Sequence, residues 1–122
     1  INKLNINRIR TSLFINPKIK NIILSKKIGS KCIELHTGKL SNLVKSKKKY
    51  QDELIKIKKC SKFAKSIGLE VHAGHGINYN TAKALSKINE IEEFNIGHFI
   101  IGESINEGLK NVIKKFKKII NK

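Results

Sequence analysis

Short apolar runs that favour strands alternate with longer segments of helical periodicity, and this alternation constrains the fold more than any other feature. The strand-like runs cover 11–15, 31–36, 69–73 and 94–96, and a helical pattern follows each of them. Four βα units in succession predict a parallel sheet with helices packed outside it. The pattern fits either an open doubly wound sheet or part of a barrel, in one domain or a piece of one over residues 1–122.

The first two predicted helices have recognisable ends. Asn16 and Pro17 predict the N-cap and the first residue of one helix, and Gly29 closes it. A polar loop is predicted at 39–49, before the second helix, which Gly68 ends. The apolar positions at helical spacing are Ile19, Ile22 and Ile23 in the first helix and Leu54, Ile57, Ala64 and Ile67 in the second.

The last two predicted helices follow the third and fourth strands. Asn80 is expected to cap the third helix, and a short apolar turn through Gly102 precedes the last one. The positions predicted to face inward are Ala82, Leu85 and Ile88, and then Ile105, Leu109, Val112, Phe116 and Ile119.

Charge and composition bear on the possible partners. A formal net charge of +17 would suit nucleic acid or an anionic membrane surface. However, the lysines are interleaved with isoleucine and asparagine along the whole chain, as in AT-rich coding sequence. Aromatic residues, on which single strands stack, make up only 6%. Nucleic acid is therefore not the favoured partner, whereas small phosphorylated substrates would be attracted by the same charge.

The sequence also bears on location and metal content. No apolar run reaches the roughly 18 to 20 residues that cross a bilayer, and the first ten residues lack the features of a secretory signal. We therefore expect a soluble, cytoplasmic protein with no membrane partner. Cys32 and Cys60 have no metal-type spacing and the histidines match no ligand motif, so reduced thiols and no metal are expected. The absence of methionine predicts a chain without its natural amino-terminal part.

Glycine and histidine gather where three predicted strands end, at 37–38, 74–76 and 97–98. The carboxyl ends of parallel strands meet at one edge, where helix N-termini offer free amide groups. Backbone without side chains can approach a phosphate closely. The predicted phosphate-binding residues are Gly76, Gly97, His98 and Gly102.

His75 is the predicted proton shuttle, because it stands between glycines at a strand end and histidine titrates near neutral pH. Glu34 lies in an apolar strand, where burying an unpaired carboxylate is expensive, so it has either a salt-bridge partner or a functional task. Plainer interpretations stay open. A glycine after a strand often only permits a turn, and His36 and His72 lie where histidine is more often a hydrogen-bonded core residue.

Four segments, SLFI, IELHTG, VHAGHGINY and FNIGHFIIGES, occur in an order that resembles the carboxy-terminal half of the pyridoxine 5′-phosphate synthase family. The similarity spans nearly the whole chain, and AGHG and NIGH are its most specific elements. It implies an α/β fold in which the chain forms the last four βα units of a TIM-type (β/α)8 barrel.

The resemblance also implies a function in vitamin B6 biosynthesis. Members of that family are transferases that condense 1-deoxy-D-xylulose 5-phosphate with 3-amino-2-oxopropyl phosphate, without a metal or an organic cofactor, and they are homo-oligomers. The family's amino-terminal half has no counterpart here, so this piece is expected to be inactive alone. The implied site residues are His75 as proton donor, Glu34 as transition-state stabiliser, Gly76, Gly97 and His98 on phosphate, and His36, Thr37 and Gly102 as secondary candidates.

Two other hypotheses remain. A different phosphate-binding TIM-barrel lyase or synthase would share only the terminal phosphate loops. A basic remnant of an enzyme would instead associate with RNA through its charge, with an affinity that falls as salt rises.

Overall fold

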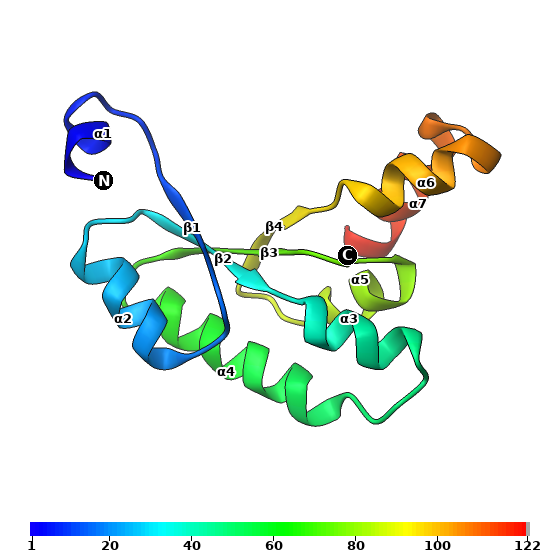
Figure 1. The fold of residues 1–122 in the computed structure, drawn as a ribbon, viewed down its shortest axis with the longest axis horizontal. Helices are drawn as coiled ribbons and strands as arrows, with labels where there is room; N and C mark the ends of the chain where they lie inside the picture. Colours follow the sequence, from blue (N-terminus) through cyan, green and yellow to red (C-terminus); the bar gives the residue numbers. More distant parts are fainter. Residues whose placement is uncertain (122) are drawn as a thin grey trace.

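The strands lie side by side in chain order in the computed structural model, which describes residues 1–121 (Figure 1). The strands are β1 (Ser12–Ile15), β2 (Cys32–His36), β3 (Glu70–Gly74) and β4 (Ile91–Asn95). The helices are α1 (Asn2–Ile6), α2 (Ile19–Lys27), α3 (Gly38–Lys45), α4 (Gln51–Ser66), α5 (Tyr79–Leu85), α6 (His98–Glu107) and α7 (Leu109–Ile120). The predicted α/β organisation with a parallel sheet is therefore confirmed.

All three strand pairs are parallel, and their order is β1-β2-β3-β4. A doubly wound sheet reverses its strand order at a switch point, and the described strands contain no such reversal. The sequential order is consistent with part of a (β/α) barrel. Because the strands are parallel and in this register, His36, Gly74 and Asn95 lie level with one another at the carboxyl edge of the sheet.

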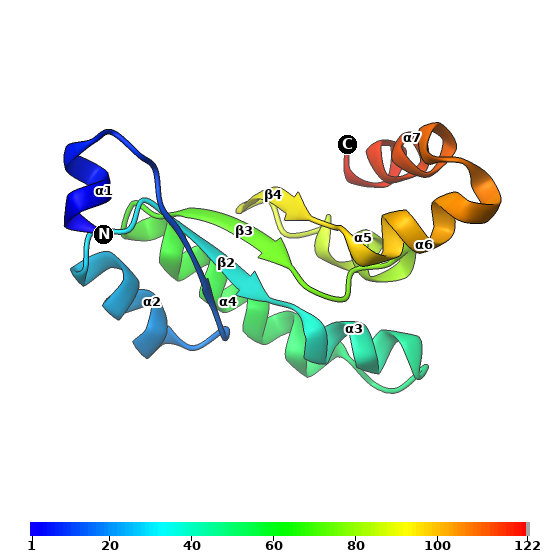
Figure 2. The same cartoon turned by 45° about the horizontal axis from the view of Figure 1, so that its top comes forward.

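The two faces of the sheet differ in chemistry because side chains alternate along a strand. Ile33 and Leu35 on β2 are fully buried beneath the helices. Figure 2 shows α2 and α4 on that side of the sheet. Glu34 and His36 point to the opposite face, which also carries the half-exposed Phe14. One face therefore forms the core, and the other presents polar side chains.

The core joins the sheet to helices that bury small or branched residues against it. Val71 and Ala73 on β3 are fully buried. The helical residues of the same cluster are Ile22 on α2, Leu40 on α3, Ile57 and Ala64 on α4, and Ala82 and Leu85 on α5. Cys32 and Cys60 are both free and buried, as expected.

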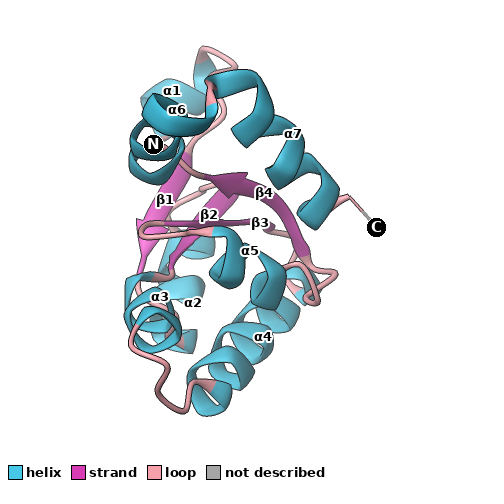
Figure 3. Cartoon of the chain, turned by 90° about the vertical axis from the view of Figure 1, so that its right-hand side faces the viewer, coloured by secondary structure: helices cyan, strands magenta, loops and turns pink. Residues whose placement is uncertain are grey.

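An aromatic cluster attaches the last two helices to α5. The ring centroids of Tyr79 and Phe116 are 4.7 Å apart, and those of Tyr79 and Phe99 are 5.0 Å apart. In Figure 3, α6 and α7 stand on the opposite side of the sheet from α2 and α4. The cluster therefore places the start of α6 beside the carboxyl ends of β3 and β4.

Two predictions in the first half were wrong. The helix expected from Asn16 and Pro17 begins at Ile19, because Asn16 bonds the Lys18 amide through its backbone carbonyl and does not cap with its side chain. The expected loop at 39–49 is in fact largely helix, since α3 occupies Gly38–Lys45. Gly29 and Gly68 do follow helix ends, each with positive φ.

The last two helices also differ from their predicted form. Asn78, rather than Asn80, caps α5 by accepting a hydrogen bond from the Thr81 amide at 2.9 Å. The expected final helix is two helices separated at Gly108, whose φ of +76° breaks the run. As a result, Ile105 and Leu109 are exposed rather than facing inward. Ile88 is buried as predicted, although it follows α5 instead of lying within it.

Glu53 on α4 is a nearly buried carboxylate with two cationic partners. Its oxygens lie 3.1 Å from Lys39 Nζ and 3.3 Å from Lys56 Nζ. Burial alone would raise the pKa of Glu53, but the hydrogen bonds from both lysines outweigh it and hold that pKa below its usual value.

No helix among residues 1–121 combines the length and apolarity needed to span a membrane.

Candidate active site at the carboxyl ends of the strands

A cavity of about 540 Å³ lies at the carboxyl edge of the sheet, between the loops after β3 and β4 and the side of α3. His75 and Gly76 line it from the first loop, and Gly97 and His98 from the second. Four residues that the sequence predicted to act together therefore meet around one space, although the two loops are separated by α5 and β4.

The turn at His75 is held in an unusual backbone conformation. His75 has a φ of +79°, in the left-handed region that favours glycine, and Gly76 follows at +75°. The hydroxyl of the fully buried Thr37 lies 2.8 Å from the Gly74 carbonyl oxygen and 2.9 Å from the His75 carbonyl oxygen. The Thr37 amide also donates to the Gly74 carbonyl at 2.8 Å. Thr37 therefore fixes the backbone from which the exposed imidazole of His75 projects.

The imidazole of His75 stacks on that of His36. Their ring centroids are 4.6 Å apart with planes at 24°, and Phe14 completes the cluster at 5.1 Å from His36. A Cβ at residue 38 would lie 2.6 Å from His36 Cε1 and 2.8 Å from His75 Cδ2. Gly38 therefore leaves room for the two rings in their stacked arrangement. Its amide donates to His36 Nδ1 at 3.3 Å, which leaves the proton of a neutral His36 ring on Nε2.

Glu34 reaches the same edge of the sheet from β2. The Asn95 side-chain amide donates to Glu34 Oε2 at 2.7 Å, so the carboxylate has a neutral partner rather than a salt bridge. Gly74 makes room for it, because a Cβ there would lie 1.8 Å from Glu34 Oε1. Asn95 lines the cavity and Glu34 does not, so Glu34 acts on the cavity wall through Asn95.

The second loop leads into α6, whose first amide groups have no acceptor within the helix. Gly97 is the N-cap residue and His98 the first residue of α6, and a Cβ at Gly97 would meet nothing within 4 Å. Lys45 at the end of α3 also lines the cavity. Free amides, an imidazole and an ammonium group are the donors that bind a phosphate.

The remaining predicted residues lie nearby but outside the lining. His36 and Thr37 support the His75 turn from beneath, as described above. Gly102 lies inside α6, and a Cβ added there would meet nothing within 4 Å. Sequence reasoning overlooked several residues of the cavity wall, namely Ser41, Asn42, Lys45, Asn78 and Asn95.

A second polar cluster lies at the amino ends of the strands. Ligand atoms of Cys32, Glu70 and His72 lie within 4.8 Å of one another, so these residues could hold a metal ion. Glu70 already has partners, since it accepts from Arg10 at 2.8 and 2.9 Å and contacts His72 Nε2 at 2.9 Å. The hydrogen bond with His72 and the Arg10 guanidinium lower the pKa of Glu70, while burial raises the pKa of the Cys32 thiol. His72 is therefore hydrogen-bonded and buried, and it does not line the cavity at His75.

The known proteins to which the chain is similar share one family description. A family model described as pyridoxal phosphate biosynthesis protein PdxJ matches residues 1–122. Proteins named pyridoxine 5′-phosphate synthase are similar to the chain. The one from Pelagibacter ubique is 60% identical over 93% of this chain and 48% of its own length. Those from Campylobacter fetus and Sulfurihydrogenibium are 40% and 46% identical, over 98% and 92% of this chain and 55% and 45% of their own lengths. The chain thus spans about half the length of these curated relatives.

Proposed function

Because the chain belongs to the PdxJ family of pyridoxal phosphate biosynthesis proteins, we propose that it supplies the phosphate-binding and proton-donating part of a pyridoxine 5′-phosphate synthase. The observation that carries the proposal is the meeting of His75, Gly76, Gly97 and His98 around one cavity. In the complete protein the four βα units would be the last four of a TIM-type barrel. The sequential parallel order of the strands supports that architecture.

The reaction joins an aminoketone phosphate to a deoxyxylulose phosphate and closes a pyridine ring, with loss of phosphate and water. Gly76, Gly97 and His98 hold the phosphate of the aminoketone. The free amides at the start of α6 support this role, because they offer donors without the bulk of side chains. Lys45 adds a positive charge on the opposite wall.

His75 donates a proton during ring formation. Its exposed imidazole on a fixed turn can reach a substrate in the cavity, and histidine exchanges protons near neutral pH. The stack with His36 limits the orientations of the ring. Glu34 lies behind Asn95 in the cavity wall, and from there its negative charge stabilises cationic character in the transition state.

The complete enzyme is proposed to be a cytoplasmic homo-oligomer that acts on small phosphorylated substrates. The polar face of the sheet, with Phe14 53% exposed, would pack against the other half of the barrel. The two substrates each carry a phosphate, and the cavity at His75 offers donors for one of them, so the other half of the barrel would supply the second phosphate site.

The test uses the complete open reading frame that contains this chain. We expect His75→Asn to lower kcat for pyridoxine 5′-phosphate formation by about 100-fold or more, as for loss of a general acid, with little change in KM for the aminoketone phosphate. His98→Asn is the matched control, since the same change on the phosphate side should raise that KM and affect kcat less. Undiminished kcat in His75→Asn would overturn the proposed role.

A further inference from the structure

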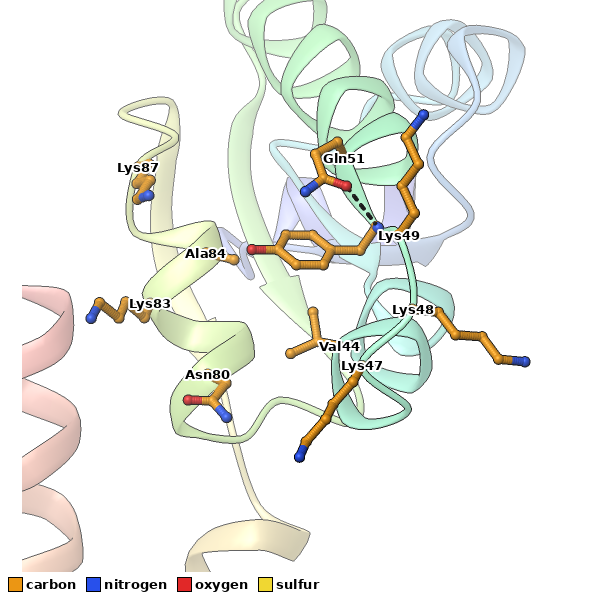
Figure 4. Close-up of a pocket in the computed structure, with 10 residues that line it drawn as sticks. Val44, Lys47, Lys48, Lys49, Gln51, Asn80, Lys83, Ala84 and Lys87 are labelled. Carbon is orange, nitrogen blue, oxygen red and sulfur yellow. Dashed lines mark hydrogen bonds between the residues drawn. The ribbon is translucent and has the colours of Figure 1, made fainter.

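A second cavity, of about 600 Å³, lies between the α3–α4 connection and α5 (Figure 4). It has no lining residue in common with the cavity at His75. Five lysines line it, and we call it the lysine pocket: Lys47, Lys48, Lys49, Lys83 and Lys87.

The lining of the lysine pocket carries positive charge and no negative charge. Lysines are five of its ten lining residues, whereas lysine and arginine together are 26 of 122 residues in the sequence, and none of the ten is acidic. Among residues 1–121, the structure gives an ion pair to Lys49 alone of the five, with the exposed Asp52 at 3.9 Å. A concave surface lined by one sign of charge concentrates counter-ions.

The backbone places these charges on two facing walls. Lys47 has a φ of +53°, and the Lys48 amide bonds the Leu43 carbonyl at 3.0 Å, so the chain turns sharply after α3. That turn puts three consecutive lysines on one wall, and Lys83 and Lys87 stand on the other (Figure 4). Their ammonium groups spread apart, as like charges do, and each flexible stem can turn inward toward a shared anion.

We propose that the lysine pocket binds a compact oligophosphate, the chain of phosphates shared by tripolyphosphate and nucleoside triphosphates. Its volume falls within the range of about 300 to 1,000 Å³ found for small-ligand pockets. A chain of three phosphates can contact lysines on both walls at once, whereas a single orthophosphate reaches one. Tyr50 is the only aromatic residue of the lining, while single-stranded nucleic acid needs a row of aromatic rings along a groove.

The experiment measures binding of tripolyphosphate, ATP and orthophosphate by isothermal titration calorimetry. It uses the product of the complete open reading frame at roughly physiological salt, where nonspecific attraction is screened. We expect saturable binding of tripolyphosphate, and at least tenfold weaker binding by the double variant Lys83→Glu/Lys87→Glu. The control Lys114→Glu/Lys118→Glu on α7 makes the same change in charge at the same spacing, on exposed residues outside the pocket. Its affinity should change less than about threefold.

Circular dichroism establishes that both double variants fold. Equal weakening in the two variants would show a response to net charge alone and would overturn the proposal. So would the lack of saturable tripolyphosphate binding, or single-stranded RNA binding that depends equally on both lysine pairs. A Tyr50→Leu variant separates the sources: weaker binding of ATP alone identifies a nucleoside triphosphate, and unchanged binding of both ligands identifies the phosphate chain.

Discussion

Replacing Gly74 with alanine tests how the sheet accommodates the Glu34 carboxylate. The new Cβ would lie 1.8 Å from Glu34 Oε1 and 2.7 Å from its Cδ, so the carboxylate must move. Because it is the end of a flexible side chain, it can swing away, but it then loses the 2.7 Å hydrogen bond from Asn95. Loss of a bond to a charged, half-buried group costs about 2 kcal/mol.

The backbone effect of the substitution has the opposite sign. Alanine restricts the unfolded chain more than glycine does, which stabilises the fold by about 0.5 kcal/mol where the conformation permits it. Gly74 lies in extended strand conformation, so alanine is permitted there. We therefore expect Gly74→Ala to lower the free energy of unfolding by about 1.5 kcal/mol, the difference between the lost bond and this gain.

The change in the free energy of unfolding is measured by urea denaturation, monitored by circular dichroism, in the wild-type protein and in a Glu34→Ala variant. In Glu34→Ala the obstructing carboxylate is absent, so only the stabilising backbone effect of about 0.5 kcal/mol should remain for Gly74→Ala, giving a coupling of about 2 kcal/mol between the sites. Gly102→Ala is the matched control, because its Cβ meets nothing within 4 Å and helix propensity favours alanine. An equal loss from Gly74→Ala in both backgrounds would refute the reasoning.

Two further predictions concern pH and the His75 turn. Glu53→Gln should lower the free energy of unfolding at pH 7 by an amount on the order of 1 kcal/mol, because the charged acceptor of two lysine ammonium groups is lost. The folded pKa of Glu53 is depressed, so its contribution is present above the unfolded value of 4.5 and is lost as pH falls through the folded pKa. The difference between the urea curves of wild type and variant should therefore shrink as the pH falls below 4.5, and a constant difference would contradict this. Thr37→Val should cost about 1 to 3 kcal/mol by removing the hydroxyl donor from the His75 carbonyl, and should speed exchange of the residue 37 amide, which bonds the Gly74 carbonyl. Thr37→Ser keeps the hydroxyl, so hydrogen exchange should show an unchanged rate at residue 37, and urea denaturation should show only the cost of the buried methyl group, about 1 kcal/mol.

The sequence predicted the parallel sheet and the meeting of its loops because both follow from short-range patterns. Apolar runs mark strands, and parallel strands bring their carboxyl ends together without further information. Helix α3 was overlooked because lysines and serines dominate 39–49. The signal was present, since Leu40, Leu43 and Val44 have helical spacing directly after Thr37.

Other features depend on contacts between distant parts of the chain. The Glu34–Asn95 bond joins residues 61 positions apart, and only the register of three strands makes them neighbours. The same register gives Gly74 its role, which sequence reasoning assigned to a turn. The break at Gly108 was also overlooked, because the apolar residues keep helical spacing across it. The helix ends there where α7 turns to pack on α5 and α6.

The left-handed backbone at His75 sets a requirement of folding against a requirement of the proposed chemistry at the same residue. Glycine would occupy that φ with less strain, yet only a side chain that carries a proton can serve the proposed reaction. Variants selected for solubility or heat resistance alone should drift toward glycine at 75, whereas selection for growth without vitamin B6 should restore histidine. The residue at this position therefore records which of the two selections a lineage has experienced.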